Sequence, residues 1–185
     1  MKKIFISIIV SLITSISVAQ SSYRGFVNTA YSFGSGEYGF NQWHINTVHG
    51  VVLFHNRLFI GGGIGLGIST ESDRLKTYSL PVFADVRYTL SNLKVKPYID
   101  MKIGYSELFD EEHDGGGDNS GGLYIFPSAG VSLSVARKTS IHVGVGYTYN
   151  RAKYEFSYIP GTGSLGRDSK RFNAGGLTLS VGFSF

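Results

Sequence analysis

The sequence predicts an eight-stranded antiparallel up-and-down transmembrane β-barrel, and three observations lead to this fold class. A short apolar segment at the N-terminus has the form of an export signal. The remaining chain has no long apolar run, so it can cross a membrane only with strands, which must close into a barrel to satisfy their backbone. Eight stretches of period-two alternation follow, joined in turn by short and long connections.

The composition fits one domain of this kind. The chain has 185 residues, only 16% of them charged, with 25 Gly, 12 Tyr and 13 Phe. It has no cysteine, which excludes disulfides and thiolate metal sites. Its basic balance could suggest nucleic acid. Without Lys2 and Lys3, however, 15 of the 17 basic residues remain against 13 acidic ones, so no nucleic-acid partner is expected.

The N-terminal segment, residues 1–19, is interpreted as a signal peptide. Lys2 and Lys3 precede an apolar stretch over 4–13, and residues 17–19 form a small-x-small cleavage site. A membrane anchor is the alternative, but the apolar stretch is shorter than the roughly 20 residues that a helical span needs. No cysteine follows the cleavage site, so a lipoprotein is not expected. Residues 20–185 are then the barrel, in the outer membrane of a Gram-negative bacterium.

The eight predicted strands follow in chain order: 22–33, 41–54, 58–69, 78–90, 95–106, 122–136, 139–151 and 171–185. The first two are the least regular. In the third, glycines at 61, 63, 65 and 67 alternate with apolar residues. Glycines that face a narrow lumen leave room for large side chains, and Tyr98 or Phe126 are expected to use that room.

The fourth and fifth strands carry charges on their polar face, namely Asp85, Arg87, Lys96, Asp100 and Lys102. A tight hairpin would place residue 85 roughly opposite residue 100. Arg87 would then lie diagonal to Asp100, and Asp85 diagonal to Lys102. These charges should pair, because unpaired burial is costly. They could line an ion path, but an eight-stranded barrel is just wide enough for its own side chains. A salt-bridge plug is therefore favoured.

The last three strands alternate most clearly between bulky apolar and small polar residues. A soluble sandwich would alternate too, but two features favour the membrane barrel. The apolar face carries no charge through its centre, and connections 55–57, 91–93 and 137–139 are tight whereas 70–77, 107–120 and 152–169 are long. Only 34–39 is a brief connection on the long side. Both termini then lie at the short-turn rim, in the periplasm.

Aromatic residues gather near the predicted strand ends. Near the long connections lie Tyr31, Phe33, Trp43, Tyr78, Tyr105, Tyr147 and Tyr149, and near the short turns lie Tyr88, Phe183 and Phe185. Two such belts are typical of the two interfaces of a membrane.

Six stretches resemble the porin-like outer-membrane β-barrel proteins, and more broadly the small eight-stranded barrels of the OmpA/OmpX kind: HINTVHG (44–50), LFIGGGIGLGIS (58–69), PVFADVRYTL (81–90), VKPYIDMKIGY (95–105), IFPSAGVSLS (125–134) and LTLSVGFSF (177–185). The ending with Phe183 and Phe185 resembles the signal that the outer-membrane assembly machinery reads. The resemblance implies fold and location. The expected partners are outer-membrane lipid and lipopolysaccharide, the assembly machinery and periplasmic chaperones, and the expected state is a monomer.

Two outer segments carry clustered charge. The acidic one holds Asp110, Glu111, Glu112, Asp114 and Asp118, and oxygen-rich clusters bind Ca²⁺ or Mg²⁺ weakly, although this spacing does not match an EF-hand. The alternative is a solvated loop, and no metal site is assigned. The basic one holds Arg151, Lys153, Lys170 and Arg171, which could contact lipid phosphates or be ordinary rim charges.

No catalytic residue and no cofactor are expected. The chain lacks G-x-S-x-G and H-E-x-x-H, and its glycines at 61–67 do not fit G-x-G-x-x-G. Among the histidines only His44 and His113 lie toward the outer end. The expected function is a structural or surface-interaction role through the extracellular loops. The alternatives are a narrow porin-like channel and a lipid-modifying outer-membrane enzyme.

Overall fold

The computed structural model describes residues 22–35, 41–69, 77–91, 93–110, 117–136, 138–158 and 166–185, with the backbone alone at 77, 110, 117–120, 152–158 and 166–174. Its strands are β1 Ser22–Ser35, β2 Gln42–Leu53, β3 Leu58–Ser69, β4 Thr77–Thr89, β5 Val95–Asp110, β6 Gly117–Ser120, β7 Gly122–Ser134, β8 Ser140–Tyr158 and β9 Gly166–Ser184. Among these residues, no helix has the length and apolar character needed to span a membrane.

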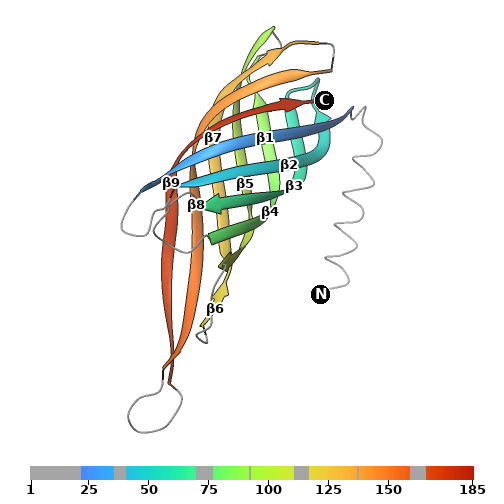
Figure 1. The fold of residues 1–185 in the computed structure, drawn as a ribbon. Coiled ribbons are helices and arrows are strands. Elements are labelled where there is room, and N and C mark those ends of the chain that lie inside the picture. Colours follow the sequence, from blue (N-terminus) through green and yellow to red (C-terminus); the bar gives the residue numbers. More distant parts are fainter. Residues whose placement is uncertain are drawn as a thin grey trace, which may run out of the picture.

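The strands form one closed antiparallel sheet (Figure 1). β1 pairs with β2 and with β9, and β9 also pairs with β8, so the first and last strands close the barrel. β6 continues the line of β7 along β8. Between the pairs Ser120–Lys153 and Tyr124–Asn150, the chain joining β6 to β7 has three residues whereas β8 has two, which is a β-bulge. The wall therefore has eight strands, as predicted.

Strands β1 to β4 and β7 begin and end within two residues of their predicted bounds. The predicted loops 107–120 and 152–169 are wrong in part, because β5 continues to Asp110, β8 to Tyr158 and β9 begins at Gly166. β8 and β9 thus form a two-stranded arm over 151–158 and 166–174, which extends beyond the other strands in Figure 1. The arm carries charged residues at close spacing. Its sequence therefore lacks the apolar alternation from which strands are recognised.

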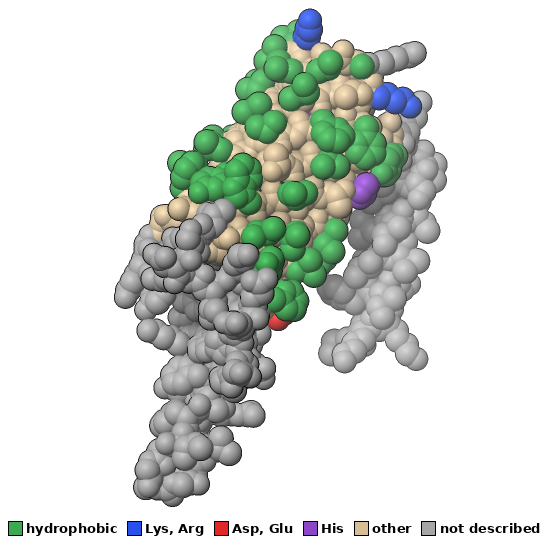
Figure 2. Space-filling model, in the orientation of Figure 1, with side chains coloured by type: hydrophobic (Ala, Val, Ile, Leu, Met, Phe, Trp, Pro, Cys, Tyr) green, Lys and Arg blue, Asp and Glu red, His purple; other side chains and the backbone are tan. Residues whose placement is uncertain are grey.

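The outer wall of the barrel is apolar and exposed. Ile99, Val143 and Leu179 on three different strands each expose about half of their surface (53%, 53% and 50%). Figure 2 shows hydrophobic side chains spread over the wall. A soluble sandwich would bury these residues, whereas a barrel in lipid turns them outward. The exposed apolar wall therefore excludes the sandwich.

Aromatic side chains occupy both ends of this wall, as predicted. Trp43 and Tyr105 are exposed near the long connections, and Phe183 and Phe185 are exposed near the short turns. Tyr31 packs edge-on against the Trp43 ring, with centroids 5.0 Å apart. The wall between these two belts is the membrane-facing surface.

The lumen is filled by side chains, and glycines make room for them. The prediction that the β3 glycines make room for Tyr98 or Phe126 is wrong. A Cβ at Gly63 would meet the Phe83 ring of the adjacent strand at 2.7 Å. The Tyr98 hydroxyl instead lies over Gly130 and Gly144, where a Cβ would be 2.6 Å away. β5, which carries Tyr98, pairs with β7, and β7 pairs with β8, so the Tyr98 side chain extends toward these two strands and away from β3.

Candidate functional site

The candidate site is the interior of the barrel, where alternation along β4 and β5 turns four charged side chains inward. Asp85, Arg87, Asp100 and Lys102 are buried, and their side chains are at most 7% exposed. We call these four residues the charged layer, and the carboxylate of Asp100 lies at its centre. Arg87 Nε donates to Asp100 Oδ1 at 3.0 Å, and the Lys102 ammonium pairs with the other oxygen of Asp100.

Two further contacts complete this layer. Ser128 Oγ on β7 donates to Asp100 Oδ2 at 3.3 Å. Lys102 Nζ lies 3.6 Å from Asp85 Oδ2. Asp100 therefore accepts from three side chains, whereas among the described cations only Lys102 lies within ion-pair distance of Asp85.

The structure pairs the residues that the sequence suggested but corrects their register. Asp85 lies directly opposite Lys102, and Arg87 directly opposite Asp100, rather than diagonally. The hairpin is offset by two residues from the expected pairing because its turn lies closer to β5. Lys96 lies half-buried nearer the short-turn rim, and it makes no ion pair with the described acidic residues.

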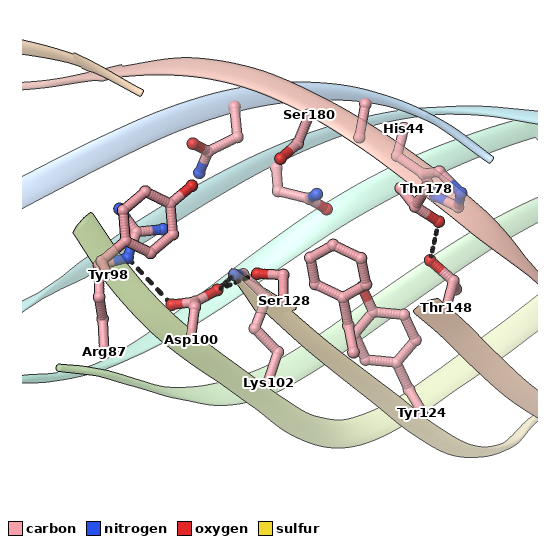
Figure 3. Close-up of a pocket in the computed structure, with 14 residues that line it drawn as sticks. His44, Arg87, Tyr98, Asp100, Lys102, Tyr124, Ser128, Thr148, Thr178 and Ser180 are labelled. Atoms are coloured by element: carbon pink, nitrogen blue, oxygen red, sulfur yellow. Dashed lines mark hydrogen bonds and ion pairs between the residues drawn. The ribbon is translucent and has the colours of Figure 1, made fainter. Parts of the chain in front are cut away.

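Aromatic rings hold the cations in place. The Arg87 guanidinium lies 4.4 Å from the ring centroids of both Phe26 and Tyr98, and Lys102 Nζ lies 5.1 Å from that of Phe126. Figure 3 shows Tyr98 over Arg87, with Asp100 between Arg87 and Lys102. Cation–π contacts of desolvated groups add to ion pairing. Sequence reasoning missed these rings, because alternation does not show which strands lie across the lumen.

Toward the long connections the lumen is lined by neutral groups. Thr178 Oγ1 lies 2.7 Å from Ser32 Oγ and 2.7 Å from Thr148 Oγ1, and Ser32 Oγ lies 2.9 Å from His44 Nε2. We call these four residues the hydroxyl layer. It joins β1, β2, β8 and β9, and all four side chains are buried. Sequence reasoning missed it too, because Ser and Thr alternate with apolar residues along most of these strands.

Between the two layers lies a cavity of about 20 Å³, lined by residues of both. This volume accommodates about one water molecule. Asn28 Nδ2, Asn46 Oδ1 and Arg87 Nη1 are buried beside it without a protein hydrogen-bond partner. The geometry can hold a small polar molecule, but it leaves no room for a larger ligand at this level.

The predicted outer charges are described only in part. Glu111, Glu112, Asp114 and His113 lie outside the described residues, and Asp110 and Asp118 are placed by their backbone in β5 and β6. Arg151 is exposed on β8. In the backbone register of the arm, Lys153 pairs with Arg171, and Tyr154 pairs with Lys170. No group of three or more His, Cys, Asp or Glu in the described segments could hold a metal ion.

The arm leaves one edge of the sheet open in the described part of the chain. The ladder between β1 and β9 ends at the pair Ser35–Gly175. Residues 166–174 of β9 pair with β8 alone, whereas β8 also pairs with β6 over 153–156. Unpaired backbone groups at a sheet edge can accept another strand.

Comparison with known proteins supports the fold. No family model and no curated protein matches the sequence. Among solved structures, Neisserial surface protein A has a TM-score of 0.62 at 15% identity, over 89% of this chain and 97% of that one. A major outer membrane protein from Thermus thermophilus has a TM-score of 0.48 at 13% identity, over 89% of this chain and 98% of that one. The outer membrane enzyme PagL has a TM-score of 0.47 at 16% identity, over 86% of this chain and 98% of that one. The closed barrel and the likeness to the Neisserial protein together show that this chain has the fold of the small eight-stranded outer-membrane β-barrels of the OmpA/OmpX kind.

Proposed function

We propose that this protein is an integral barrel of a Gram-negative outer membrane, that its lumen is closed by its own side chains, and that it acts through the β8–β9 arm as a surface-interaction protein. The exposed apolar wall and the aromatic belts support the membrane location. The proposed signal peptide over residues 1–19 lies outside the described residues. A barrel of this kind should migrate differently on SDS gels before and after boiling, and free solubility without detergent would contradict the membrane location.

The edge of the arm that is open among the described residues is the observation that carries the interaction role. Along residues 166–174 every second residue directs its backbone N–H and C=O away from β8. An extended segment of another protein can pair with such an edge, with main-chain hydrogen bonds supplying affinity. An edge left open at the cell surface is otherwise a liability, because it invites unspecific pairing. A binding role gives such an edge a function.

A photocross-linking experiment tests this role. The chain has no cysteine, so Ser169→Cys on the arm can be labelled uniquely with a thiol-reactive photocross-linker in intact outer membranes. Ser35→Cys is the control, because it lies on β1 where β1 and β9 pair at the same rim. We expect discrete higher-mass adducts from Ser169→Cys and none from the control. Equal adducts from both positions, or none from the arm, would contradict the proposal.

The closed lumen is supported by the charged layer and by the small cavity of about 20 Å³ between the two layers. Ions would have to displace buried, paired side chains to pass. The wild-type protein should therefore give no steady single-channel steps in planar bilayers. Steady steps would instead support the narrow porin-like channel.

One observation bears on the alternative that this protein is an enzyme: Ser32 Oγ lies 2.9 Å from His44 Nε2. A nucleophile must reach its substrate, but Ser32 is buried in the lumen and its hydroxyl contacts Thr148 and Thr178. We therefore assign no catalysis to this pair. Lipid A mass spectra from cells with and without the gene test this assignment, and a mass shift that Ser32→Ala abolishes would restore the lipid-modifying enzyme.

A further inference from the structure

The charged side chains at the short-turn rim are all basic. Five basic residues of the described chain lie there: Arg24, Arg57, Lys94, Lys96 and Lys138. No Asp or Glu occurs in the sequence stretches that form this rim, which are 22–28, 50–60, 88–98, 132–142 and 181–185. In Figure 2, Lys and Arg appear at the end of the barrel where Figure 1 places the C-terminus, and no acidic colour is visible there.

Each of the three short turns combines a cation with an exposed apolar side chain. Phe54 is 72% exposed in the turn that carries Arg57, and Leu93 is 73% exposed beside Lys94. In the third turn Val135 is 64% exposed near Lys138. Exposed apolar groups of this size at three successive turns are costly in water. They are favourable where they enter the acyl region of a membrane beneath the headgroups.

The backbone of this rim is tied together. Thr89 N donates to the Arg57 carbonyl at 2.7 Å, and Ser134 N donates to the Lys94 carbonyl at 3.1 Å. These bonds join the first short turn to the β4–β5 hairpin and the second short turn to the β7–β8 hairpin. The first turn is also strained, because Phe54, His55 and Asn56 all have positive φ (48°, 55° and 66°). Such strain in non-glycine residues persists where the surroundings impose it.

We infer that Arg57, Lys94 and Lys138, with Phe54, Leu93 and Val135 beside them, form a collar that binds the anionic headgroups of phospholipids in the leaflet at the short-turn rim. The cations contact lipid phosphates while the apolar side chains insert between the acyl chains. The positive charge of these side chains is complementary to an anionic headgroup, which favours an anionic phospholipid as the ligand. The inference rests on the proposed membrane location and adds a lipid preference to it.

Lipid retention measures this preference. The full barrel is refolded into nanodiscs of phosphatidylglycerol and phosphatidylcholine in equal amounts with matched acyl chains, extracted into mild detergent, and its retained lipids are counted by mass spectrometry. We expect the wild type to retain phosphatidylglycerol selectively. Arg57→Gln, Lys94→Gln and Lys138→Gln together should reduce the preference by about fivefold per charge removed. High salt should weaken it as well, because exposed charges are screened.

The matched control removes three cations from the sequence stretches 70–77 and 152–169, with Arg74→Gln, Lys76→Gln and Arg167→Gln, and should leave the preference unchanged. Equal retention of both lipids by the wild type, or an equal loss in the control, would overturn the collar. Sedimentation with isolated peptidoglycan that the rim triple abolishes, without any lipid preference, would assign the rim to the cell wall instead. A chain that fails to enter the nanodisc at all contradicts the proposed membrane location rather than the lipid preference alone.

Discussion

The two layers of the lumen are held together by contacts of different range in the sequence. The charged layer is local in sequence, because Arg87 and Asp100 lie only 13 residues apart on one hairpin. The hydroxyl layer is long-range, because Ser32 and Thr178 lie 146 residues apart on the first and last strands. The charged layer can therefore form with the β4–β5 hairpin, whereas the hydroxyl layer forms only when the barrel closes.

The two layers also differ in what they lose when one member is removed. Each partner in the charged layer compensates an ion that would otherwise be buried in a medium of low polarity. Removal of one partner leaves that ion uncompensated. A hydroxyl that loses its partner leaves only a neutral dipole unsatisfied, which costs much less. The charged layer should therefore contribute more to the free energy of unfolding than the hydroxyl layer does. Removal of one charged group should cost more than removal of one hydroxyl.

The largest effect is expected at Asp100. Asp100→Asn leaves Arg87 and Lys102 buried without their shared carboxylate, and it should lower the free energy of unfolding by about 3–5 kcal/mol. Urea unfolding in lipid vesicles, followed by the fluorescence of the single Trp43, measures it.

Asp85 provides a test within the same layer. Asp85→Asn should cost less than Asp100→Asn, because the Asp85 carboxylate has one described cation within ion-pair distance, Lys102 at 3.6 Å, whereas Asp100 has two. Lys102 also keeps its pairing with Asp100 in this variant. Equal losses in the two variants would show that the layer does not centre on Asp100.

The next largest effect is expected where the charged layer meets β8. The Tyr98 hydroxyl lies over Gly144, where a Cβ would be 2.6 Å away, so Gly144→Val should displace the ring and destabilise the barrel by about 1–3 kcal/mol. Gly62→Ala is the control, because its added Cβ would meet its nearest atom at 3.8 Å. The same unfolding assay applies. A Gly144→Val protein as stable as Gly62→Ala would mean that Tyr98 does not need this space.

The strands in the membrane could be predicted because lipid requires one apolar face and a narrow lumen requires the other to be small or polar. That requirement ends beyond the aromatic belts, so residues 152–158 and 166–169 of the arm carry no such pattern, and the sequence predicts a loop there. The charge pairs Arg87–Asp100 and Asp85–Lys102 could be predicted because they lie on one hairpin. The cation–π contacts of Arg87 with Phe26 could not, since no local signal relates β1 to β4 across the lumen.

A smaller effect is expected in the hydroxyl layer. Thr178→Val keeps the shape of the side chain but removes the hydroxyl that contacts Ser32 and Thr148, each at 2.7 Å. The expected cost is about 1–2 kcal/mol. Thr29→Val makes the same change on the exposed outer face of β1, where it should be neutral or stabilising in lipid. If both variants lost equal stability, the hydroxyl contacts would not matter to barrel closure.

The smallest effect is expected at Ser128, where a hydroxyl joins the charged layer. Its Oγ donates to Asp100 Oδ2 at 3.3 Å, the longest of the contacts to that carboxylate. Ser128→Ala removes a donor while both cations remain, so the loss should be about 0.5–1 kcal/mol in the same unfolding assay. A loss as large as that of Asp100→Asn would mean that the hydroxyl, rather than the two cations, compensates the carboxylate. The contrast between charged and neutral contacts would then fail within a single layer.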